Sequence, residues 1–153
     1  MQMKNEKTSM ATGDPLAIAD QFAQALDREK YAVAESLISD RCEYHCRGSV
    51  YHGPAEIVAS YQGNGDVAKQ FDAVEYESTV ERELNGQIRV RFVDHLTHRG
   101  QRLTFRCEQV VEIGERGKIV RIEHIDLPGQ TEALAEFKKT AFGQTPKSER
   151  ESG

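Results

Sequence analysis

Three consecutive stretches of alternating polar and apolar residues constrain the fold of this chain more than any other feature. They predict strands over residues 87–98, 101–113 and 118–127, joined by short polar turns. An alternation of period two over this length indicates a sheet with one buried face and one wetter face. We therefore expect the rest of the chain to be organised around an antiparallel sheet in its second half.

Polar residues interrupt the apolar faces of these strands. Asp94 shares the buried face of the first strand with Phe92. The other interruptions are Gln109 on the second strand, and His124 and Asp126 on the third. A buried polar group is costly without a partner. Four such groups on the covered side of a sheet therefore predict a pocket.

Helical periodicity appears on both sides of this region. Asp14 is a predicted N-cap, and the spacing of the apolar residues behind it predicts a first helix. A second helix is expected over residues 31–38. Pro54 begins a third, which we expect to be interrupted or to end at Gly63-Asn64-Gly65 because glycine is costly inside a helix. A final helix is expected over residues 130–142.

Short strands are expected over residues 41–47 and 50–52, and a first long strand is expected over residues 71–83, after the third helix. The last of them precedes Asn85-Gly86, which is typical of a two-residue type I′ hairpin turn. Helices ahead of a run of antiparallel strands indicate the α+β class.

The composition is typical of a soluble globular protein. With 153 residues, 38% hydrophobic and 29% charged, the chain can bury one sizeable core. We assign a single domain to residues 14–142, between a disordered segment (1–13) and a loose tail (143–153). A formal charge of −5 argues against a nucleic-acid partner. No apolar run approaches the roughly 20 residues of a membrane helix, and no secretion signal is evident. We therefore expect no membrane partner and a cytoplasmic location.

The segment Cys42-Glu-Tyr-His45-Cys46 contains metal-ligand residue types but does not predict a metal site. On a strand, Cys42 and Cys46 lie about 13 Å apart, with His45 on the opposite face. One tetrahedral zinc, with bonds of about 2.3 Å, cannot span that distance. With Cys107 the cysteine count is odd, which does not suggest a disulfide framework. We expect free thiols, no metal and no cofactor.

Three segments resemble a known superfamily. They are Asp27-x₃-Tyr31-Ala-x-Ala-Glu-Ser-Leu-Ile-Ser-Asp40, Glu-Tyr-His45-Cys-Arg-Gly48 and Gly53-Pro-Ala-Glu-Ile57. Together with the element order, they are similar to the nuclear transport factor 2-like superfamily, and within it to SnoaL-like polyketide cyclases and the ketosteroid isomerase branch. The resemblance implies a cone, in which a curved antiparallel sheet wraps around three helices and leaves a pocket at its open end. It also implies a dimer through the outer sheet face, as in many members.

The resemblance further implies positions for site residues. The isomerase branch has a catalytic acid at the position that Tyr44 or His45 occupies in this chain. It has a second acid at the position of Gln109, and a tyrosine at about the position of Phe22. These residue types are not retained here, so steroid isomerisation by that machinery is not expected. Cyclases and dehydratases of the superfamily use His and Asp pairs in the cone, which could be supplied by His45, Asp94, His124 and Asp126.

The residues themselves favour His124 and Asp126 as a catalytic pair, because residues two apart on a strand share a face. A histidine oriented by a carboxylate is a usable general base near neutral pH. The alternative is that both meet solvent at a strand end. Asp94 is a further catalytic candidate, and its alternative is a structural ion pair with an arginine. Periodicity places Tyr44 inside and His45 outside, whereas the resemblance favours His45 near the pocket.

Other residues are candidates for contact with a substrate. Gln109 is suited to hydrogen bonding a substrate oxygen, or alternatively to satisfying a neighbouring group. Tyr61, on the buried side of the third helix, fits a pocket wall or the core better than a catalyst. The remaining candidates are aromatic or aliphatic, namely Phe22, Phe92, Tyr44, Val111 and Ile122.

Two classes of function stay open. The first is a cofactor-independent acid–base enzyme, of the cyclase, dehydratase or isomerase type, acting on a small apolar carbonyl compound in the cone. The second is a non-catalytic ligand-binding or dimerisation module, a common use of such folds. We also expect a homodimer, because the outer sheet face clusters Val93, Val110 and Ile125 among charges of both signs.

Overall fold

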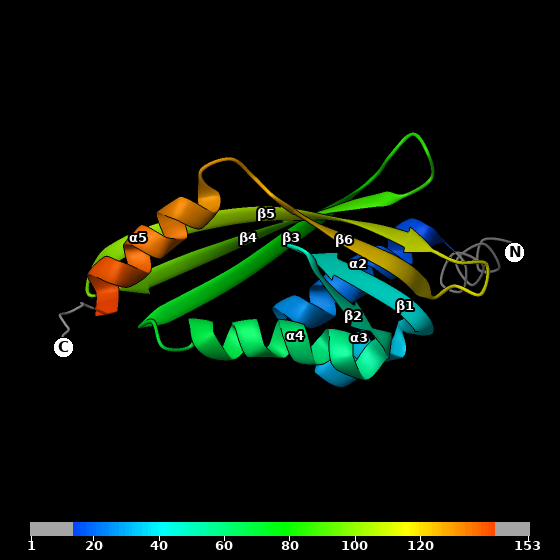
Figure 1. The fold of residues 1–153 in the computed structure, drawn as a ribbon, viewed down its shortest axis with the longest axis horizontal. Helices are drawn as coiled ribbons and strands as arrows, with labels where there is room; N and C mark the ends of the chain where they lie inside the picture. The colour runs from blue at the N-terminus through cyan, green and yellow to red at the C-terminus, as the bar shows by residue number, and fades with distance from the viewer. Residues whose placement is uncertain (1–13, 143–153) are drawn as a thin grey trace, which may run out of the picture.

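The computed structural model describes residues 14–142, so the expectations for residues 1–13 and 143–153 lie outside it. In chain order, three helices within residues 14–142 come before the long strands and one comes after them (Figure 1). In chain order the elements are α2 (Pro15–Asp27), α3 (Tyr31–Ser36), β1 (Ile38–Cys46), β2 (Ser49–His52), α4 (Gly53–Ala68), β3 (Ala73–Arg82), β4 (Ile88–His98), β5 (Gln101–Ile113), β6 (Ile119–Asp126) and α5 (Gln130–Phe142).

All six strands form one sheet in the order β2-β1-β6-β5-β4-β3. The antiparallel meander predicted for the second half of the chain is confirmed, and it runs from β3 to β6 without a helix. The sheet is not antiparallel throughout, because β1 pairs with β6 in parallel. Parallel pairing needs a long connection, which the intervening residues from β2 to β5 provide. The α+β class is confirmed, with this correction to the strand pairing.

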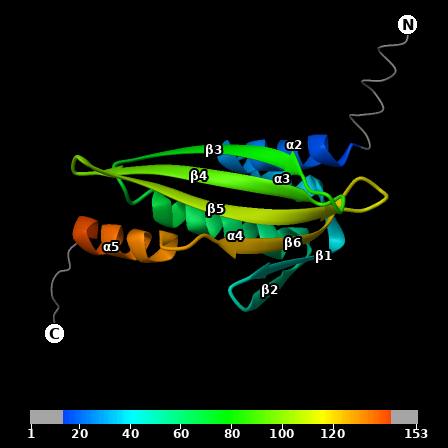
Figure 2. The ribbon, with the colours of Figure 1, turned by 90° about the horizontal axis from the view of Figure 1, so that it is seen from above.

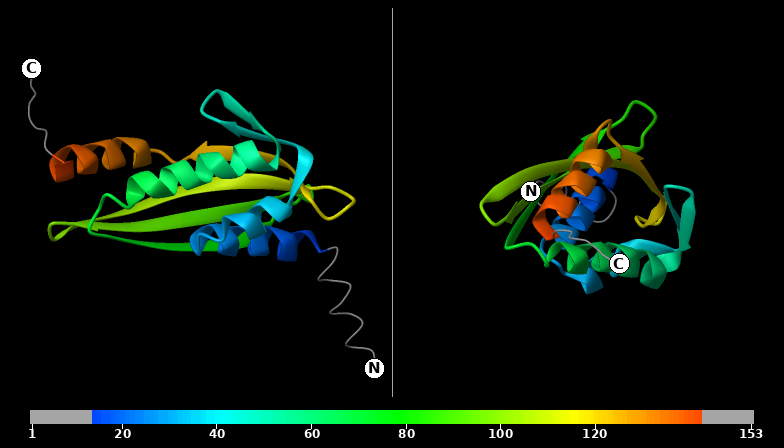
Figure 3. Two further views of the ribbon diagram at one scale, coloured as in Figure 1. Left: turned by 90° about the horizontal axis from the view of Figure 1, so that it is seen from below. Right: turned by 60° about the vertical axis from the view of Figure 1, so that its left-hand side comes forward.

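The sheet curves around helices that cover only one of its faces. Helix α2 contacts β3, β4 and β5, while α4 contacts β1 and β2. Figure 2 shows the opposite face of the long strands without a covering helix. The right-hand view in Figure 3 shows the sheet curling over the helices. The cone shape implied by the sequence resemblance is therefore present.

The core lies between the concave sheet face and these helices. Phe22 and Ile57 are fully buried core residues on the helices, and Val90 is a fully buried core residue on the sheet. Ile119 and Ile122 are also both fully buried, although residues three apart on a regular strand face opposite sides. A register shift of β6 against β5 accounts for this, because a bulge reverses the side of the following residue.

The turn at Asn85-Gly86 differs from the prediction. The hydrogen bond from Gly86 N to Glu83 O closes a three-residue loop, and Gly86 alone takes positive φ, at 88°. This is the type I turn with a following left-handed residue, rather than a type I′ turn, which requires positive φ at both central positions. Positive φ at both positions instead occurs at Arg99-Gly100, between β4 and β5.

Two helix boundaries also differ from the prediction. Helix α4 continues through Gly63 and Gly65 to Ala68. At Gly65 a Cβ atom would lie 3.0 Å from the Tyr31 hydroxyl, so the close approach of α3 accounts for this glycine. The second helix ends at Ser36, two residues early, because the next residues join the sheet beside β6.

Helix α5 packs at the far end of the long strands, away from the main core (Figure 1). Its Ala141 forms a separate hydrophobic cluster with Phe71 and Leu96. None of the helices within residues 14–142 has the length and apolar character that a membrane crossing requires.

Candidate functional site

A cavity of about 320 Å³ lies on the concave side of the sheet. Its walls come from the inner faces of β1 and of β3 to β6, and from helices α2 to α5. Small-molecule sites commonly occupy roughly 300–1,000 Å³. The cone is therefore hollow enough to hold a compact ligand.

Several of the predicted site residues meet at this cavity. Asp94, Gln109 and His124 all line it, as do the aromatic residues Tyr44, Tyr61 and Phe92. Phe22, Val111 and Ile122 do not line it, because each is fully buried in the core beneath the wall. Phe22 nevertheless supports the wall, since its ring packs edge-on against Tyr61 with centroids 5.7 Å apart.

Gln109 is the centre of a hydrogen-bond network on the cavity wall. Its side chain is almost completely buried, with 2% of the residue exposed. The Tyr61 hydroxyl donates to Gln109 Oε1 at 2.6 Å, and Gln109 Nε2 donates to the Tyr44 hydroxyl at 3.1 Å. The two tyrosine rings stack, with centroids 5.2 Å apart and planes 5° from parallel. We call Tyr44, Tyr61, Gln109 and His124 the Gln109 network.

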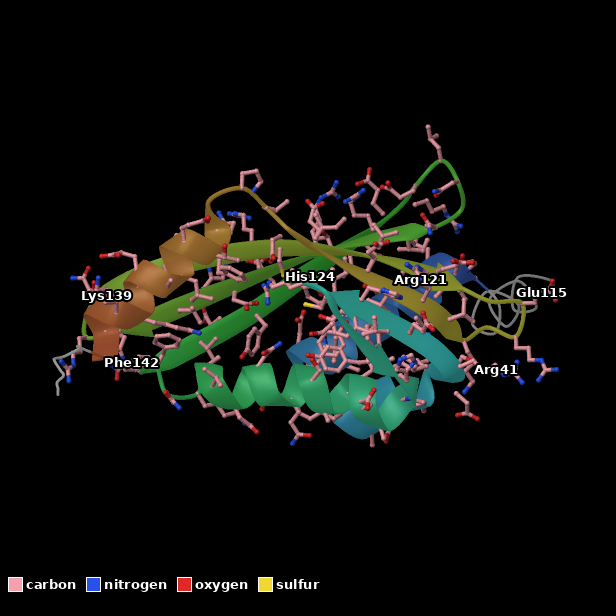
Figure 4. The ribbon with its side chains drawn as sticks, in the orientation of Figure 1. Arg41, Glu115, Arg121, His124, Lys139 and Phe142 are labelled. Carbon is pink, nitrogen blue, oxygen red and sulfur yellow. The ribbon has the colours of Figure 1, made fainter. Side chains whose placement is uncertain are left out.

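His124 connects this network to Asp126. Gln109 Nε2 lies 3.2 Å from His124 Nδ1, and His124 Nε2 lies 2.9 Å from Asp126 Oδ1. Only 8% of the His124 side chain is exposed, against 31% for Asp126. Figure 4 shows His124 in the middle of the molecule. The two residues do form the predicted couple, but Asp126 itself is not on the cavity wall.

Arg47 is a member of this site that sequence reasoning missed. Its guanidinium donates to both carboxylate oxygens of Asp126, from Nε and Nη2, at 2.7 Å each. These bonds are the main reason that the pKa of Asp126 is lowered to about 2. Arg47 has positive φ (49°) in the turn between β1 and β2, and it also lines the cavity. No local pattern indicates this contact, because it depends on the parallel pairing of β1 with β6.

A second polar region, which we call the acidic wall, consists of Asp27, Tyr76 and Asp94. Asp94 makes no ion pair with any described residue, so the arginine partner considered above is not found. Burial, followed by the charge of Asp27, raises the pKa of Asp94 to about 6. Burial also raises the pKa of Asp27, although the hydroxyl of Ser78 donates to it at 2.7 Å.

The Tyr76 hydroxyl in this wall is buried and has no hydrogen-bond partner within the described residues. Burial and the nearby Asp94 raise its pKa to about 12. An unpaired buried hydroxyl costs about 1–3 kcal/mol. A polar ligand group beside Tyr76 would remove that cost.

The two regions lie apart along the cavity. Asp94 is the register partner of Phe105 on β5, four residues before Gln109. At about 3.3 Å per residue, their positions along the strands differ by roughly 13 Å. Asp94 and His124 therefore do not form a pair, and they would act on different parts of a ligand.

His45 does not line the cavity, which corrects the expectation taken from the resemblance. Its Nε2 lies 3.0 Å from Glu43 and 3.1 Å from Arg121, so it belongs to a charged cluster beside the cone. Tyr44 occupies the inner position with 3% of the residue exposed, as strand periodicity predicts.

The described residues contain no group of three His, Cys, Asp or Glu side chains that could hold a metal ion. Cys42 and Cys107 have pKa values raised to about 12 by burial, so their thiols are protonated at neutral pH. A thiol in that state is a poor nucleophile. The polar groups on the cavity wall are carboxyl, imidazole, amide and phenol groups, together with the Arg47 guanidinium, the Lys138 ammonium and the thiols of Cys46 and Cys107.

Comparisons with solved structures identify the architecture. No model of a protein family matches the sequence, and no curated protein matches it significantly. A protein proposed to be a polyketide cyclase, from Pseudomonas putida KT2440, superposes with a TM-score of 0.59 at 14% identity, over 76% of this chain and 94% of that one. An NTF2-like protein of unknown function from Exiguobacterium sp. 255-15 gives 0.55 at 17% identity, over 72% and 98%. The chain has the nuclear transport factor 2-like fold.

Another structure with this fold is an epoxide hydrolase from M. tuberculosis, which superposes with a TM-score of 0.58 at 17% identity, over 86% of this chain and 98% of that one. Identities this low establish the nuclear transport factor 2-like fold and no activity. The function of this chain must be argued from the Gln109 network and the acidic wall.

Proposed function

We propose that this protein is a cofactor-independent acid–base enzyme acting on a small, largely apolar carbonyl compound held in the cavity. The observation that carries the proposal is Asp94, a carboxyl group on the cavity wall with no ion-pair partner among the described residues and a pKa raised to about 6. A carboxyl group titrating close to neutral pH is suited to proton transfer. Similar structures named for polyketide cyclisation and epoxide hydrolysis support small-molecule chemistry in this fold.

The roles follow from the separation of the two polar regions. In the Gln109 network the Tyr44 hydroxyl accepts from Gln109 Nε2, so its own proton can be donated to a carbonyl oxygen in the cavity. Asp94 lies farther along the cavity and removes or returns a proton at a carbon of the same ligand. The distance between the regions favours a compound about two fused rings long, in which conjugation links the reacting carbon to the carbonyl group.

The reaction class can be tested without knowing the natural substrate. Octalone, a bicyclic conjugated enone, is incubated with the protein in D₂O, and exchange of its ring protons is followed by NMR. We expect exchange above the buffer rate that rises as the pH increases through about 6, because Asp94 acts as a base when ionised. Asp94→Asn should reduce exchange by about 10²-fold or more, whereas Asp20→Asn on the exposed side of α2 should not.

A non-catalytic binding module is the second candidate, and one observation favours it. Both polar atoms of the Gln109 amide and both nitrogens of His124 are already hydrogen bonded within the chain. A network satisfied in this way is stable without a substrate. Binding of octalone without proton exchange at any pH would support the binding module and exclude the proposed enzymatic function.

We also propose a cytoplasmic location. The three cysteines of the chain are all free, which suits a reducing compartment.

A further inference from the structure

The face of α5 that meets the cavity carries a lysine. Leu134 and Lys138 are one helical turn apart and both line the cavity. The helix is held in place by its residues Leu134, Phe137 and Ala141, which belong to one hydrophobic cluster with Phe71 and Leu96. The packing of α5 therefore determines the position of Lys138.

Lys138 has no counter-ion in the part of the chain that the structure describes. No ion pair among residues 14–142 includes it. The charges acting on Asp94 are those of Asp27 and His95, so Lys138 does not neutralise that carboxyl group. The other basic side chain on the cavity wall is Arg47, which Asp126 already binds.

The neighbouring residue provides a contrast. Lys139 is exposed and does not line the cavity, and Figure 4 shows it on the outside of α5. Lys138 is only partly exposed. Its positive charge has no partner among the described residues, so a cavity ligand that supplies a negative charge would bind better than a neutral one.

We propose that Lys138 binds a carboxylate group of the ligand at the α5 end of the cavity. The ligand is then an apolar keto acid. This narrows the class of carbonyl compound in the proposed function, and the presence of a carbonyl group in the ligand rests on that proposed function. A single ammonium on a cavity wall that also includes the apolar residues Val67, Ala68 and Phe71 suits a monoanion. Phosphate groups are typically held by several donors, from guanidinium forks or helix N-termini.

A matched pair of probes tests the charge alone. Benzoylpropionate carries an aryl ketone and a carboxylate, and benzoylpropionamide replaces the carboxylate with an uncharged amide of similar shape. Their dissociation constants are measured by titration calorimetry at a pH well above the Asp94 pKa of about 6, so that Asp94 stays ionised. We expect the acid to bind roughly five- to ten-fold more tightly than the amide at low salt. That preference should shrink in about 1 M salt, where the screening length falls to about 3 Å.

Variants at the two lysines assign the effect. Lys138→Met keeps most of the apolar stem and should reduce the preference to about one, through weaker binding of the acid alone. Lys138→Arg keeps the charge and should retain the preference, and so should Lys139→Met. A Lys138→Met protein with the wild-type preference overturns the proposal. Equal binding of the acid and the amide by the wild type also overturns the proposal. So does a Lys139→Met protein that loses the preference for the acid to the same extent as Lys138→Met.

The proposed reaction and this contact fail separately. If octalone exchange is absent but the protein prefers the acid and this preference depends on Lys138, the proposed enzymatic function is wrong and the carboxylate site stands. If exchange occurs and the acid has no advantage over the amide, the enzyme stands and the role of Lys138 is wrong.

Discussion

Gln109 on β5 and His124 on β6 are register partners, and Gln109 Nε2 lies 3.2 Å from His124 Nδ1. The amide is oriented by Tyr61, whose hydroxyl donates to Gln109 Oε1. Since an amide NH₂ only donates, Nδ1 of His124 accepts. The proton of a neutral His124 then lies on Nε2, where Asp126 accepts it. A ligand must therefore displace Gln109 before Nδ1 can act as a base.

The first prediction is the tautomer of His124. Long-range ¹⁵N–¹H correlation spectra of the neutral ring should show the Nε2–H form, because Nδ1 is an acceptor from Gln109 and Nε2 faces Asp126. The exposed His52 provides an internal comparison in the same spectrum. A predominantly Nδ1–H ring would mean that the Gln109 amide has the opposite orientation.

The second prediction concerns the stability that Gln109 provides. Gln109→Leu leaves the hydroxyls of Tyr61 and Tyr44 and one nitrogen of His124 without this partner. We expect the free energy of unfolding to fall by about 2 kcal/mol or more, since each unpaired buried group costs about 1–3 kcal/mol. Urea unfolding measures the change. Gln101→Leu, at the exposed start of β5, is the control and should change stability by less than about 0.5 kcal/mol.

The third prediction concerns the ion pair between Arg47 and Asp126. The pKa of Asp126 is lowered to about 2 in the folded protein, from its usual 3.8. A carboxyl group with a lowered pKa stabilises the fold above its unfolded pKa, and the stabilisation is lost as the pH falls towards 2. Because 53% of the Arg47 side chain is exposed, we discount the effect to about 1 kcal/mol.

Urea unfolding of Arg47→Gln across pH checks this. The variant should be less stable than the wild type at neutral pH, and the difference should decrease between about pH 4 and pH 2. Arg41→Gln is the control, since Arg41 is exposed on β1, the strand that leads into the turn of Arg47. A difference that stays constant down to pH 2 would show that Arg47 acts through packing rather than charge.

The fourth prediction concerns Asp94, whose pKa is shifted in the opposite direction. It is raised from 3.8 to about 6, so the ionised group destabilises the folded state, and stability is lost as the pH rises from about 4 to about 6. One pKa unit corresponds to about 1.4 kcal/mol. Asp94→Asn should therefore be more stable than the wild type by roughly 2 kcal/mol above pH 7, and the advantage should vanish below pH 4.

Thermal or urea unfolding of Asp94→Asn against Asp20→Asn measures this advantage. A gain in stability that accompanies the loss of octalone exchange is the pattern of a group kept for function. If Asp94→Asn is instead destabilised at every pH, the carboxylate has a structural role that its environment does not reveal.

The sequence predicts the sheet well because its signal is local. Alternation along each strand depends on the strand's own two faces, so the inner placement of Asp94, Gln109 and His124 follows from period two alone. The same rule places Tyr44 inside the cone and His45 outside. Where the resemblance and the periodicity disagreed, at His45, the periodicity predicted the observed position.

The features that sequence reasoning missed depend on contacts between distant segments. Arg47 reaches Asp126 only because β1 lies beside β6, and Asp27 reaches the cavity only because α2 ends over β3, where Ser78 binds it. Gly65 inside helix α4 is explained by Tyr31, whose hydroxyl would lie 3.0 Å from a Cβ atom at that position. No pattern within one segment carries these placements.

The last prediction is a homodimer through the outer face of the long strands. Figure 2 shows that no helix covers this face. Val93, Val110 and Ile125 are half-buried on it. The surrounding charges are already paired within the chain, as in the bonds of Arg89 to Glu83 and Glu108. We therefore expect the apolar residues, rather than ion pairs between subunits, to stabilise the interface.

Sedimentation at micromolar concentration measures the mass, and two substitutions that add the same charge place the interface. Val110→Glu should give a monomer, because it buries a carboxylate at the apolar centre of the contact. Ala135→Glu, on the exposed side of α5, should leave the dimer intact. A wild-type protein of monomer mass excludes the dimer. A dimer that survives Val110→Glu but dissociates in Ala135→Glu would move the interface to α5, where it would lie beside the cavity end that Lys138 occupies.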